Sequence, residues 1–295
     1  MIRKTVFFVA ALLWLAGIVC AQSPPAEPPA APSPRVSTVE EVGAEFDAVP
    51  CNNKNRRDAV KALFEKMGAT PEEISVEKAG SAENVIVKIA GTSANDEKIV
   101  IGAHFDKTAD GCGAIDNWTG VVSIAHIYRT MKTLKPNRTL IFVGFGEEEK
   151  GLVGSRAMVD KIKKEEVAGY CAMINIDSLG MTITQAADNL SSKTLIETTA
   201  TIAKEMGMQF AHANIQGGSD SGSFLYKKIP AITLHGLTND WPKILHSSYD
   251  TPKKVNHQSV YLGYRLGLML LAKVDESACD AFREVKPDKD KKEKK

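Results

Sequence analysis

The sequence predicts an α/β domain in which a mostly parallel, mixed central sheet carries helices on both faces, giving a three-layer sandwich. Two observations support this prediction. Short apolar runs rich in β-branched residues alternate along the chain with longer segments of helical periodicity. The apolar runs are nearly continuous, which is typical of strands that are covered on both faces of a doubly wound sheet.

The individual elements follow from these two patterns. Five segments are predicted as strands, namely 84–90, 98–104, 138–146, 171–177 and 230–236. Three segments are predicted as amphipathic helices, namely 118–134, 191–207 and 257–274. In the first helix, one face collects Val121, Ile124, Ala125, Tyr128 and Met131.

The N-terminus has the pattern of a secretory signal peptide. Two basic residues, Arg3 and Lys4, precede an apolar stretch that ends at Cys20, and Val-Cys-Ala forms a small-residue cleavage pattern. The stretch is shorter than the ~20 residues that a membrane span needs, so an uncleaved anchor is the weaker alternative. A lipoprotein cleaved at Cys20 is weaker still, because the preceding residues lack the expected order. The prediction is a cleaved signal over 1–21 and a secreted or periplasmic protein.

The rest of the chain divides by composition. Residues 22–35 form a Pro/Ala-rich tether without enough apolar surface to fold, and residues 286–295 form a Lys-rich, disordered tail. Between them, 36–285 is long enough for one domain with a well-buried core. We predict a single folded domain there.

Charge argues against nucleic acid as a partner. The formal net charge is +1, and no basic stripe with interleaved aromatic residues occurs. The basic tail is better explained as a solvated terminus than as a membrane contact, so no stable membrane partner is expected. The sequence leaves the oligomeric state open.

Four cysteines remain after removal of the predicted signal peptide. Cys51, Cys112, Cys171 and Cys279 can form two disulfides in an oxidising compartment, with three possible connectivities. Cys171 lies in an apolar run and is equally compatible with a buried free thiol.

Polar residues gather at the predicted carboxyl ends of the strands, where α/β sheets bind their ligands. His104 and Asp177 each end a strand, and the three glutamates 147–149 follow another. His246 lies in the loop after the last strand, and Asp116 stands at the start of a helix. Residues from separate strands therefore meet at one rim.

Each of these residues has a simpler explanation when taken alone. Asp116 is compatible with a helix N-cap, a lone histidine with a core or surface residue, and paired glutamates with a solvated turn. Together, however, carboxylates at one rim repel one another unless cations neutralise them. Imidazole and carboxylate ligands without a thiolate motif favour zinc over cobalt or manganese. Because the ligand set exceeds that of one zinc, we infer two Zn²⁺ per chain that share a bridging carboxylate.

Five motifs, in one order, resemble the secreted dizinc aminopeptidases of peptidase family M28, which include the bacterial leucyl aminopeptidases. They are GAHFDKTADGCGAIDNWTGV, FGEEEKGLVGS, NIDSLG, GGSDSGSFLYKKIPAITL and HSSYDT. The resemblance runs from about residue 80 to residue 273. Single motifs of this kind are weak, but five in order are specific. The resemblance implies a zinc-dependent exopeptidase, a secreted hydrolase acting on peptides.

The resemblance distinguishes the three glutamates. In the family the glutamate pair is followed by one residue and then Gly-Leu, so Gly151 and Leu152 identify the pair as Glu148 and Glu149. By this correspondence Glu148 is the general base and Glu149 a metal ligand. Glu147 falls outside the pair and is expected at the surface or behind the ligands.

The same correspondence implies the ligand set. Asp116 resembles the carboxylate that bridges both ions. His104 and Asp177 would complete one ion, and Glu149 and His246 the other. The family places its last histidine ligand in the HSSYDT loop, which favours His246 over His235.

Asp106 resembles the carboxylate that orients a ligand histidine and supports catalysis from behind the ligands. Its simpler explanation is a turn-forming aspartate. Three further histidines are assigned no catalytic role, namely His126, His212 and His257. Ser219 and Asp220 match a family signature, although a helix cap explains them as well.

One position departs from the family. Some relatives have a tyrosine, able to donate to a developing oxyanion, where this chain has Leu245. Tyr249 and Tyr226 are candidate substitutes.

Three alternatives to an aminopeptidase are compatible with the same fold. The first is a glutaminyl cyclase, whose centre resembles one that holds a single zinc. The second is a carboxypeptidase, for which no basic pocket is identified, and the third is a non-catalytic binding module. The retained ligands and base argue against the last.

Overall fold

A computed structural model describes residues 35–284. The predicted signal peptide, nearly all of the predicted tether and the Lys-rich tail lie outside the described residues. The domain boundaries proposed above therefore remain predictions.

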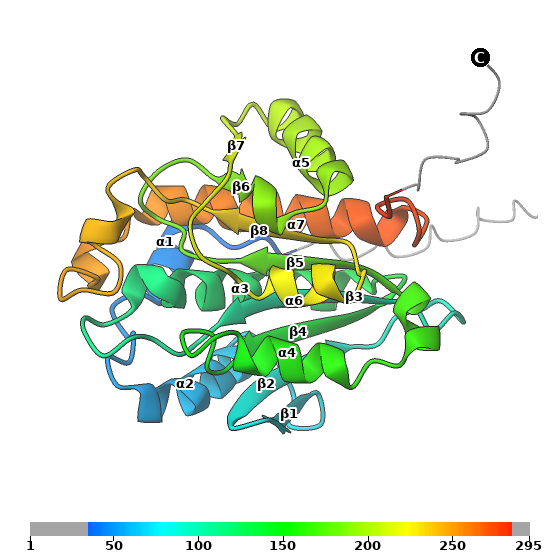
Figure 1. Cartoon of the computed structure of the whole chain (residues 1–295), viewed down its shortest axis with the longest axis horizontal. Helices are drawn as coiled ribbons and strands as arrows, with labels where there is room; N and C mark the ends of the chain where they lie inside the picture. The colour runs from blue at the N-terminus through cyan, green and yellow to red at the C-terminus, as the bar shows by residue number, and fades with distance from the viewer. Residues whose placement is uncertain (1–34, 285–295) are drawn as a thin grey trace, which may run out of the picture. The chain divides into compact units, whose positions relative to one another are not determined.

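The centre of the domain is one eight-stranded sheet with the order β1-β2-β4-β3-β5-β8-β6-β7 (Figure 1). Its four middle strands, β4, β3, β5 and β8, run parallel, while β1 and β2 at one edge and the β6–β8 pair at the other are antiparallel. The strands span Ile74–Ala79, Ala82–Ile89, Lys98–His104, Thr139–Phe145, Tyr170–Ile176, Gln185–Ala187, Ala211–Ala213 and Ala231–His235, from β1 to β8.

Strand β3 shows why the central strands are apolar along most of their length. Successive side chains point to opposite faces of the sheet. Ile99 and Ile101 enter the hydrophobic core on one face, while Val100 enters the core on the other. Since both faces are covered by helices, every position of the strand gains from an apolar side chain. The α/β fold predicted from these runs is confirmed.

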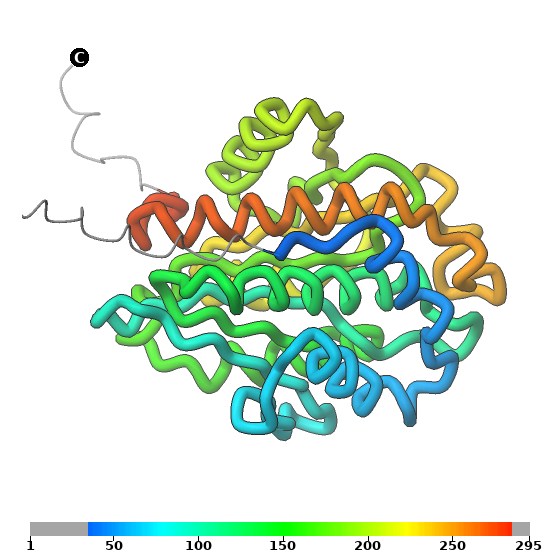
Figure 2. The backbone as a smooth tube through the Cα atoms, turned by 180° about the vertical axis from the view of Figure 1, so that it is seen from behind, coloured from blue at the N-terminus to red at the C-terminus, as the bar shows by residue number. Residues whose placement is uncertain are grey.

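The helices form two layers. Figure 2 shows α3 and α7 lying side by side over one face of the sheet, next to α2, whereas α4 and α6 cover the opposite face in Figure 1. Helix α5 packs against α7. The seven α-helices span Val39–Gly43, Asn53–Lys66, Thr119–Leu134, Val153–Asp160, Lys193–Glu205, Ser221–Tyr226 and His257–Glu276, from α1 to α7.

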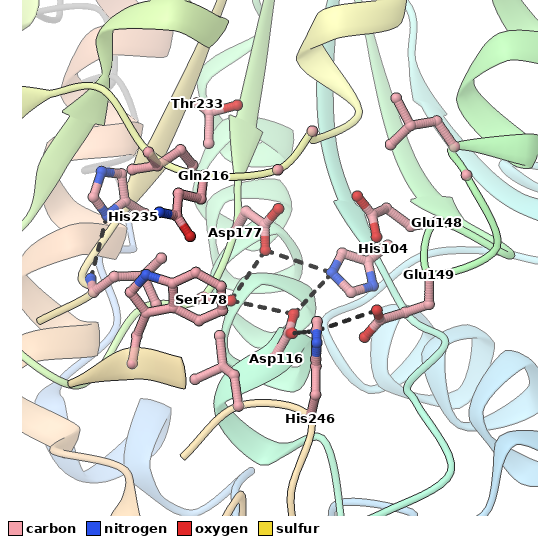
Figure 3. A pocket seen from close by; sticks show the side chains of 18 of the residues that line it. His104, Asp116, Glu148, Glu149, Asp177, Ser178, Gln216, Thr233, His235 and His246 are labelled. Carbon is pink, nitrogen blue, oxygen red and sulfur yellow. Dashed lines mark hydrogen bonds and ion pairs between the residues drawn. The ribbon is translucent and has the colours of Figure 1, made fainter. Parts of the chain in front are cut away.

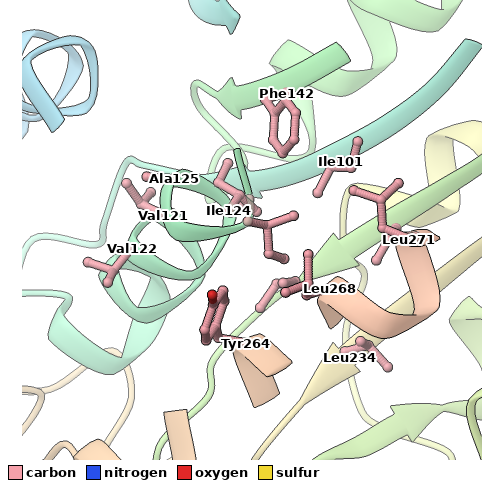
Figure 4. Packing of buried hydrophobic residues seen from close by; sticks show 14 of the residues in the cluster. Ile101, Val121, Val122, Ile124, Ala125, Phe142, Leu234, Tyr264, Leu268 and Leu271 are labelled. Carbon is pink, nitrogen blue, oxygen red and sulfur yellow. The ribbon is translucent and has the colours of Figure 1, made fainter. Parts of the chain in front are cut away.

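The larger core lies between α3, α7 and the sheet (Figure 4). Ile124 of α3 and Leu268 and Leu271 of α7 point into it, and Phe142 of β4 meets them from the sheet. Burying such a side chain contributes about 1.5–3 kcal/mol. This packing holds the strand ends, and hence the site, at fixed positions.

The predicted elements agree with the structure to within two residues at each end. Helices predicted over 118–134, 191–207 and 257–274 are α3, α5 and α7, and the five predicted strands are β2, β3, β4, β5 and β8. The apolar patterns of the sequence did not indicate β1, β6, β7 or the helices α1, α2, α4 and α6. Strands β6 and β7 have three residues each, and α2 carries seven charged side chains among its 14 residues, so neither gives a strong apolar period.

Two disulfides link segments of the domain that are far apart in the sequence. Cys51 pairs with Cys112, and Cys171 pairs with Cys279, which is one of the three connectivities that the sequence allowed. Cys171 is therefore not a free thiol. The first disulfide links the segment before α2 to the loop after β3, and the second links β5 to the segment after α7.

None of the helices within residues 35–284 has both the length and the apolar character required to span a bilayer.

Candidate metal centre

The five predicted ligands come together above the carboxyl ends of the parallel strands (Figure 3). His104 is the last residue of β3, and Asp177 directly follows β5. Glu149 lies in the loop after β4, and His246 in the loop after β8. Asp116 comes from an irregular turn, Ala114–Trp118, that leads into α3, and its peptide bond to Asn117 is cis.

The side chains form two groups that share Asp116. In the first, Nε2 of His104 lies 3.1 Å from Oδ1 of Asp116 and 3.5 Å from Oδ1 of Asp177. In the second, Nε2 of His246 lies 2.9 Å from Oδ2 of Asp116 and 3.2 Å from Oε2 of Glu149. Within each group the potential ligand atoms lie within 4.8 Å of one another. Asp116 thus offers one carboxylate oxygen to each group.

The donor set and its burial fit zinc. His104 is 1% exposed and Asp116 is 7% exposed, so water does not screen their charges fully. Oε1 of Glu149 is buried and has no hydrogen-bond partner among the described residues. A buried carboxylate oxygen without a partner costs free energy that a cation would recover. Three carboxylates and two imidazoles are the ligand types that zinc accepts.

The pKa values of the carboxyl groups show that negative charge is in excess at this site. Burial raises the pKa of Glu148 to about 10, with Asp220 and Asp177 adding to the rise against the opposing charge of His104. Burial and the charge of Asp116 raise the pKa of Glu149 to about 7. Without a bound cation, protons must neutralise these side chains.

The same negative charges also raise the pKa values of His104 and His246. Burial alone would lower the pKa of His104, but Glu148 and the other surrounding carboxylates raise it well above its ordinary value. The hydrogen bond to Asp116 raises the pKa of His246 to about 8. In turn, hydrogen bonds from both histidines outweigh burial and hold the pKa of Asp116 below its usual range.

Asp106 connects two of these elements. Its carboxylate accepts hydrogen bonds from the backbone N–H groups of Glu148 and Glu149, at 2.9 and 3.2 Å. Its Oδ1 also lies 3.6 Å from Nδ1 of His104, and its backbone oxygen lies 3.2 Å from the same nitrogen. Asp106 therefore holds the loop that carries the glutamate pair and lies beside His104, and its role as an orienting residue stays a prediction.

The structure separates the three glutamates in space. Glu148 and Glu149 both line a cavity of about 380 Å³ at the metal centre. Glu147 points elsewhere, because its carboxylate accepts hydrogen bonds from Ser81 at 2.6 Å and Lys150 at 2.8 Å. The middle residue of the run is thus the one glutamate that faces the cavity without belonging to either ligand group.

His235 lies on the wall of the same cavity but outside both ligand groups. It is 3% exposed, and its Nδ1 accepts a hydrogen bond from the backbone N–H of Leu237. Burial lowers the pKa of His235 to about 4, so the ring stays neutral. The preference for His246 over His235 as a ligand stays a prediction.

The other three histidines lie in surroundings that suggest no part in the centre. Nδ1 of His126 is 2.7 Å from the hydroxyl of Ser37, inside the core. His212 pairs with Asp188 at the surface, and His257 packs against Phe46.

Two supporting residues were not recognised from the sequence. Asp250, in the HSSYDT motif, accepts hydrogen bonds from the backbone N–H groups of Ile115 and Asp116, at 2.7 and 3.1 Å. Arg56 is fully buried, and its guanidinium donates to backbone oxygens of the two loops around the centre, at Pro50, Phe105, Cys112 and Gly113. An arginine in a polar helical segment gives no sign in sequence that it will be buried.

Ser219 also acts differently from a helix cap. Its hydroxyl donates to Oδ2 of Asp177 at 2.5 Å and is itself held by the side-chain amide of Asn175. Asp220, next to it, is fully buried and makes no capping hydrogen bond to α6. The Ser-Asp signature thus lies directly behind the ligands.

Neither tyrosine considered as a replacement for the missing oxyanion donor faces the cavity. Tyr226 is 85% exposed and Tyr249 is 62% exposed, and neither lines the cavity. Leu245, in contrast, is buried and forms part of the cavity wall.

Known proteins share both the fold and the motifs. Residues 84–262, more than half of the chain, match peptidase family M28. The matched residues include the strand ends at which the imidazole and carboxylate side chains gather. This chain belongs to peptidase family M28.

Curated relatives match only parts of the chain. The vacuolar membrane protease of Saccharomyces cerevisiae is 38% identical over 79 residues, which cover 27% of this chain and 8% of that protein. Aminopeptidase YwaD of Bacillus subtilis is 25% identical over 151 residues, which cover 49% of this chain and 33% of that protein. The matched part of this chain thus spans a third or less of each of these two relatives.

Solved structures show the same fold. The zinc aminopeptidase BSAP from Bacillus subtilis has a TM-score of 0.60 at 19% identity, and the match covers 68% of this chain and 53% of that one. A glutaminyl cyclase from an Acidobacteriales bacterium has a TM-score of 0.71 at 17% identity, and the match covers 87% of this chain and 99% of that one.

Zinc binding to the metal-free protein at pH 6 is expected to release protons. The pKa values of Glu149 and His246, about 7 and about 8, mean that both hold protons at pH 6, which a cation would displace. Affinity should therefore fall as the pH falls below about 8. Calorimetric titration in two buffers of different ionisation enthalpy measures the release; identical heats in both buffers at pH 6 would contradict the expectation.

Replacing Arg56 with methionine is expected to lower the free energy of unfolding by about 3–5 kcal/mol, because buried carbonyl oxygens lose a charged donor. Urea unfolding of the metal-free protein measures this. Arg57→Met is the matched control on the same helix. Its side chain is 40% exposed and forms surface ion pairs, so its loss should cost less than about 1 kcal/mol. If both variants lose the same free energy of unfolding, the buried hydrogen bonds of Arg56 contribute no more to stability than the surface ion pairs of Arg57.

Proposed function

We propose that this protein is a zinc-dependent aminopeptidase that holds two Zn²⁺ and hydrolyses the N-terminal peptide bond of its substrate. The observation that carries the proposal is the pair of ligand groups sharing Asp116. His104 and Asp177 would hold one ion, Glu149 and His246 the other, and Asp116 would bridge them. When bound, zinc polarises a carbonyl group and lowers the pKa of a water molecule.

Glu148 is the proposed general base. Its carboxylate faces the cavity and belongs to neither ligand group, which leaves it free to move protons. In the metal-free protein its pKa lies at about 10, and two cations beside it would lower that value toward the range of a base that works at neutral pH. Glu148 then accepts a proton from the attacking water and passes it to the leaving amine.

The carboxylate oxygens of the cavity support an exopeptidase. Asp116, Glu148, Glu149 and Asp177 line it, so the free amine of a substrate N-terminus would lie near hydrogen-bond acceptors there. Apolar side chains form the other wall, namely Ile215, Leu237, Trp241 and Leu245. Such a wall suits an apolar substrate side chain.

Export through the predicted signal peptide over 1–21 is part of the proposal. That segment lies outside the described residues, and the support comes from the folded domain. Its two disulfides, Cys51–Cys112 and Cys171–Cys279, are typical of proteins that fold in an oxidising compartment, such as the periplasm or the extracellular space.

A glutaminyl cyclase is the second candidate, because the cyclase cited above is matched over 99% of its length. A peptide that begins with glutamine separates the two activities. An aminopeptidase releases free glutamine and a peptide shortened by one residue, whereas a cyclase releases ammonia and leaves the peptide length unchanged. Mass spectrometry of the products distinguishes these outcomes.

Glu148→Ala is expected to lower kcat for an aminoacyl fluorogenic substrate by at least about 10²-fold while metal content and thermal stability are retained. The fluorogenic assay and metal analysis are run on the same preparation. Glu147→Ala is the matched control, since the adjacent glutamate pairs with Ser81 and Lys150 outside the cavity, and it should keep most of the activity. If Glu148→Ala also loses zinc, Glu148 is a ligand and the assignment of the base is wrong.

Metal analysis after zinc reconstitution is expected to approach two ions per chain. His246→Ala should lower the content toward one ion, because it removes a ligand from one group only. His235→Gln is the control, since that histidine lies on the cavity wall outside both groups and should leave the content unchanged. A stable content of one ion in the wild-type protein would favour the cyclase.

A further inference from the structure

A second cavity continues from the one at the metal centre. It has a volume of about 520 Å³ and lies between α4 and α6, which pack side by side on one face of the sheet (Figure 1). Leu152 and Arg156 line both cavities, so the two spaces meet at these side chains. A substrate held at the metal centre can therefore extend along this groove.

The surface of the groove is suited to a peptide chain. Tyr226, at the C-terminal end of α6, is 85% exposed, which is unusual for so large an apolar ring. Leu152, at the N-cap of α4, adds apolar surface. An aromatic ring and aliphatic side chains beside a polar backbone are common features of peptide-binding surfaces.

Arg156 supplies the charge at the junction. Its side chain is exposed, and within residues 35–284 no carboxylate lies within ion-pair distance of it. Asp160, one turn further along α4, also lines the groove but makes no ion pair with Arg156. Near the other large cavity, Arg57 pairs with Glu83 and Lys150 pairs with Glu147, whereas Lys54 and Lys78 make no ion pair within residues 35–284. A cation without a partner favours an anionic group of the ligand.

We propose that the leaving part of an extended peptide substrate passes over Leu152 and Arg156 into the groove between α4 and α6, and that Arg156 selects an acidic side chain just after the scissile bond. The proposal rests on the aminopeptidase function proposed above. It commits to a side chain rather than to the terminal carboxylate of a dipeptide, because the groove continues past Arg156 to Tyr226 and a dipeptide would leave that part empty.

The competing exit is the larger cavity beside α2, which meets the metal centre at Glu149. Glu149 is a proposed ligand, so a chain leaving that way would have to pass over a side chain that holds metal. At the α4–α6 junction, the shared side chains belong to neither ligand group. Continuity with the proposed site therefore favours the α4–α6 groove.

The test compares substrates with and without a leaving peptide, using the zinc-loaded full chain. The substrates are a leucyl coumarin amide and three pentapeptides, Leu-Glu-Ala-Ala-Ala, Leu-Ala-Ala-Ala-Ala and Leu-Lys-Ala-Ala-Ala. The variants are Arg156→Ala, Arg156→Glu and Tyr226→Ala. Arg265→Ala is the matched control, an exposed arginine on α7 outside both cavities.

The quantity compared is the ratio of kcat/KM for a pentapeptide to kcat/KM for the coumarin amide. Arg156→Ala should lower this ratio roughly fivefold for the Glu peptide, mainly through KM, and leave the Ala peptide nearly unchanged. Arg156→Glu should reverse the preference between the Glu and Lys peptides, and Tyr226→Ala should lower the ratio for all three. Arg265→Ala should leave every ratio as in the wild type.

The results separate the two proposals. Equal losses on the amide and on all peptides in the Arg156 variants would overturn the groove proposal alone, because they would show a general effect on the site. Unchanged ratios in both Arg156 variants and in Tyr226→Ala would also overturn it. If the wild-type protein cleaves neither the amide nor any pentapeptide, the aminopeptidase function fails as well.

Discussion

The crowding of carboxylates around two imidazoles is the constraint on which the site depends. Asp116 lies at hydrogen-bond distance from both His104 and His246, and it is nearly fully buried. A charge in that position must be neutralised by protons or by cations. Protons and metal cations therefore compete to neutralise the negative charge of this centre.

The surrounding structure supports this crowded arrangement. Asp250 and Asp106 accept hydrogen bonds from backbone N–H groups in the segments that carry Asp116, Glu148 and Glu149. These hydrogen bonds fix the positions of the predicted ligands in those segments. Arg56 binds the carbonyl oxygens of the loop before Asp116, and the Cys51–Cys112 disulfide closes the same loop. The loop also passes close to the one that carries His246, since a side chain at Gly111 would meet the backbone oxygen of Ser247. Glycine is required at that close approach, and Gly111 also has a positive φ.

The sequence predicts the central part of this structure because its signals are local. A strand such as β3 is a run without polar side chains from Ile99 to Ala103, and α3 repeats an apolar face, so both are recognisable without tertiary contacts. The five ligands could be proposed because they follow strand ends and match ordered motifs. Arg56 could not, because its burial depends on carbonyl groups up to 57 residues away along the chain. The disulfide pairing and the exposure of Tyr226 are likewise properties of the folded chain only.

Charge balance gives a further reason to prefer two ions to one. Four carboxylates, those of Asp116, Glu148, Glu149 and Asp177, line the cavity, and two divalent cations carry the matching charge. A single cation would leave two negative charges for protons to offset, and Glu148, whose pKa of about 10 is above the value of about 7 for Glu149, would take up a proton first. Glu148 would then remain protonated at neutral pH, and a protonated carboxyl group cannot accept a proton from water. A second cation frees Glu148 to act as a base, so the chemistry proposed for this residue and the proposed number of ions depend on each other.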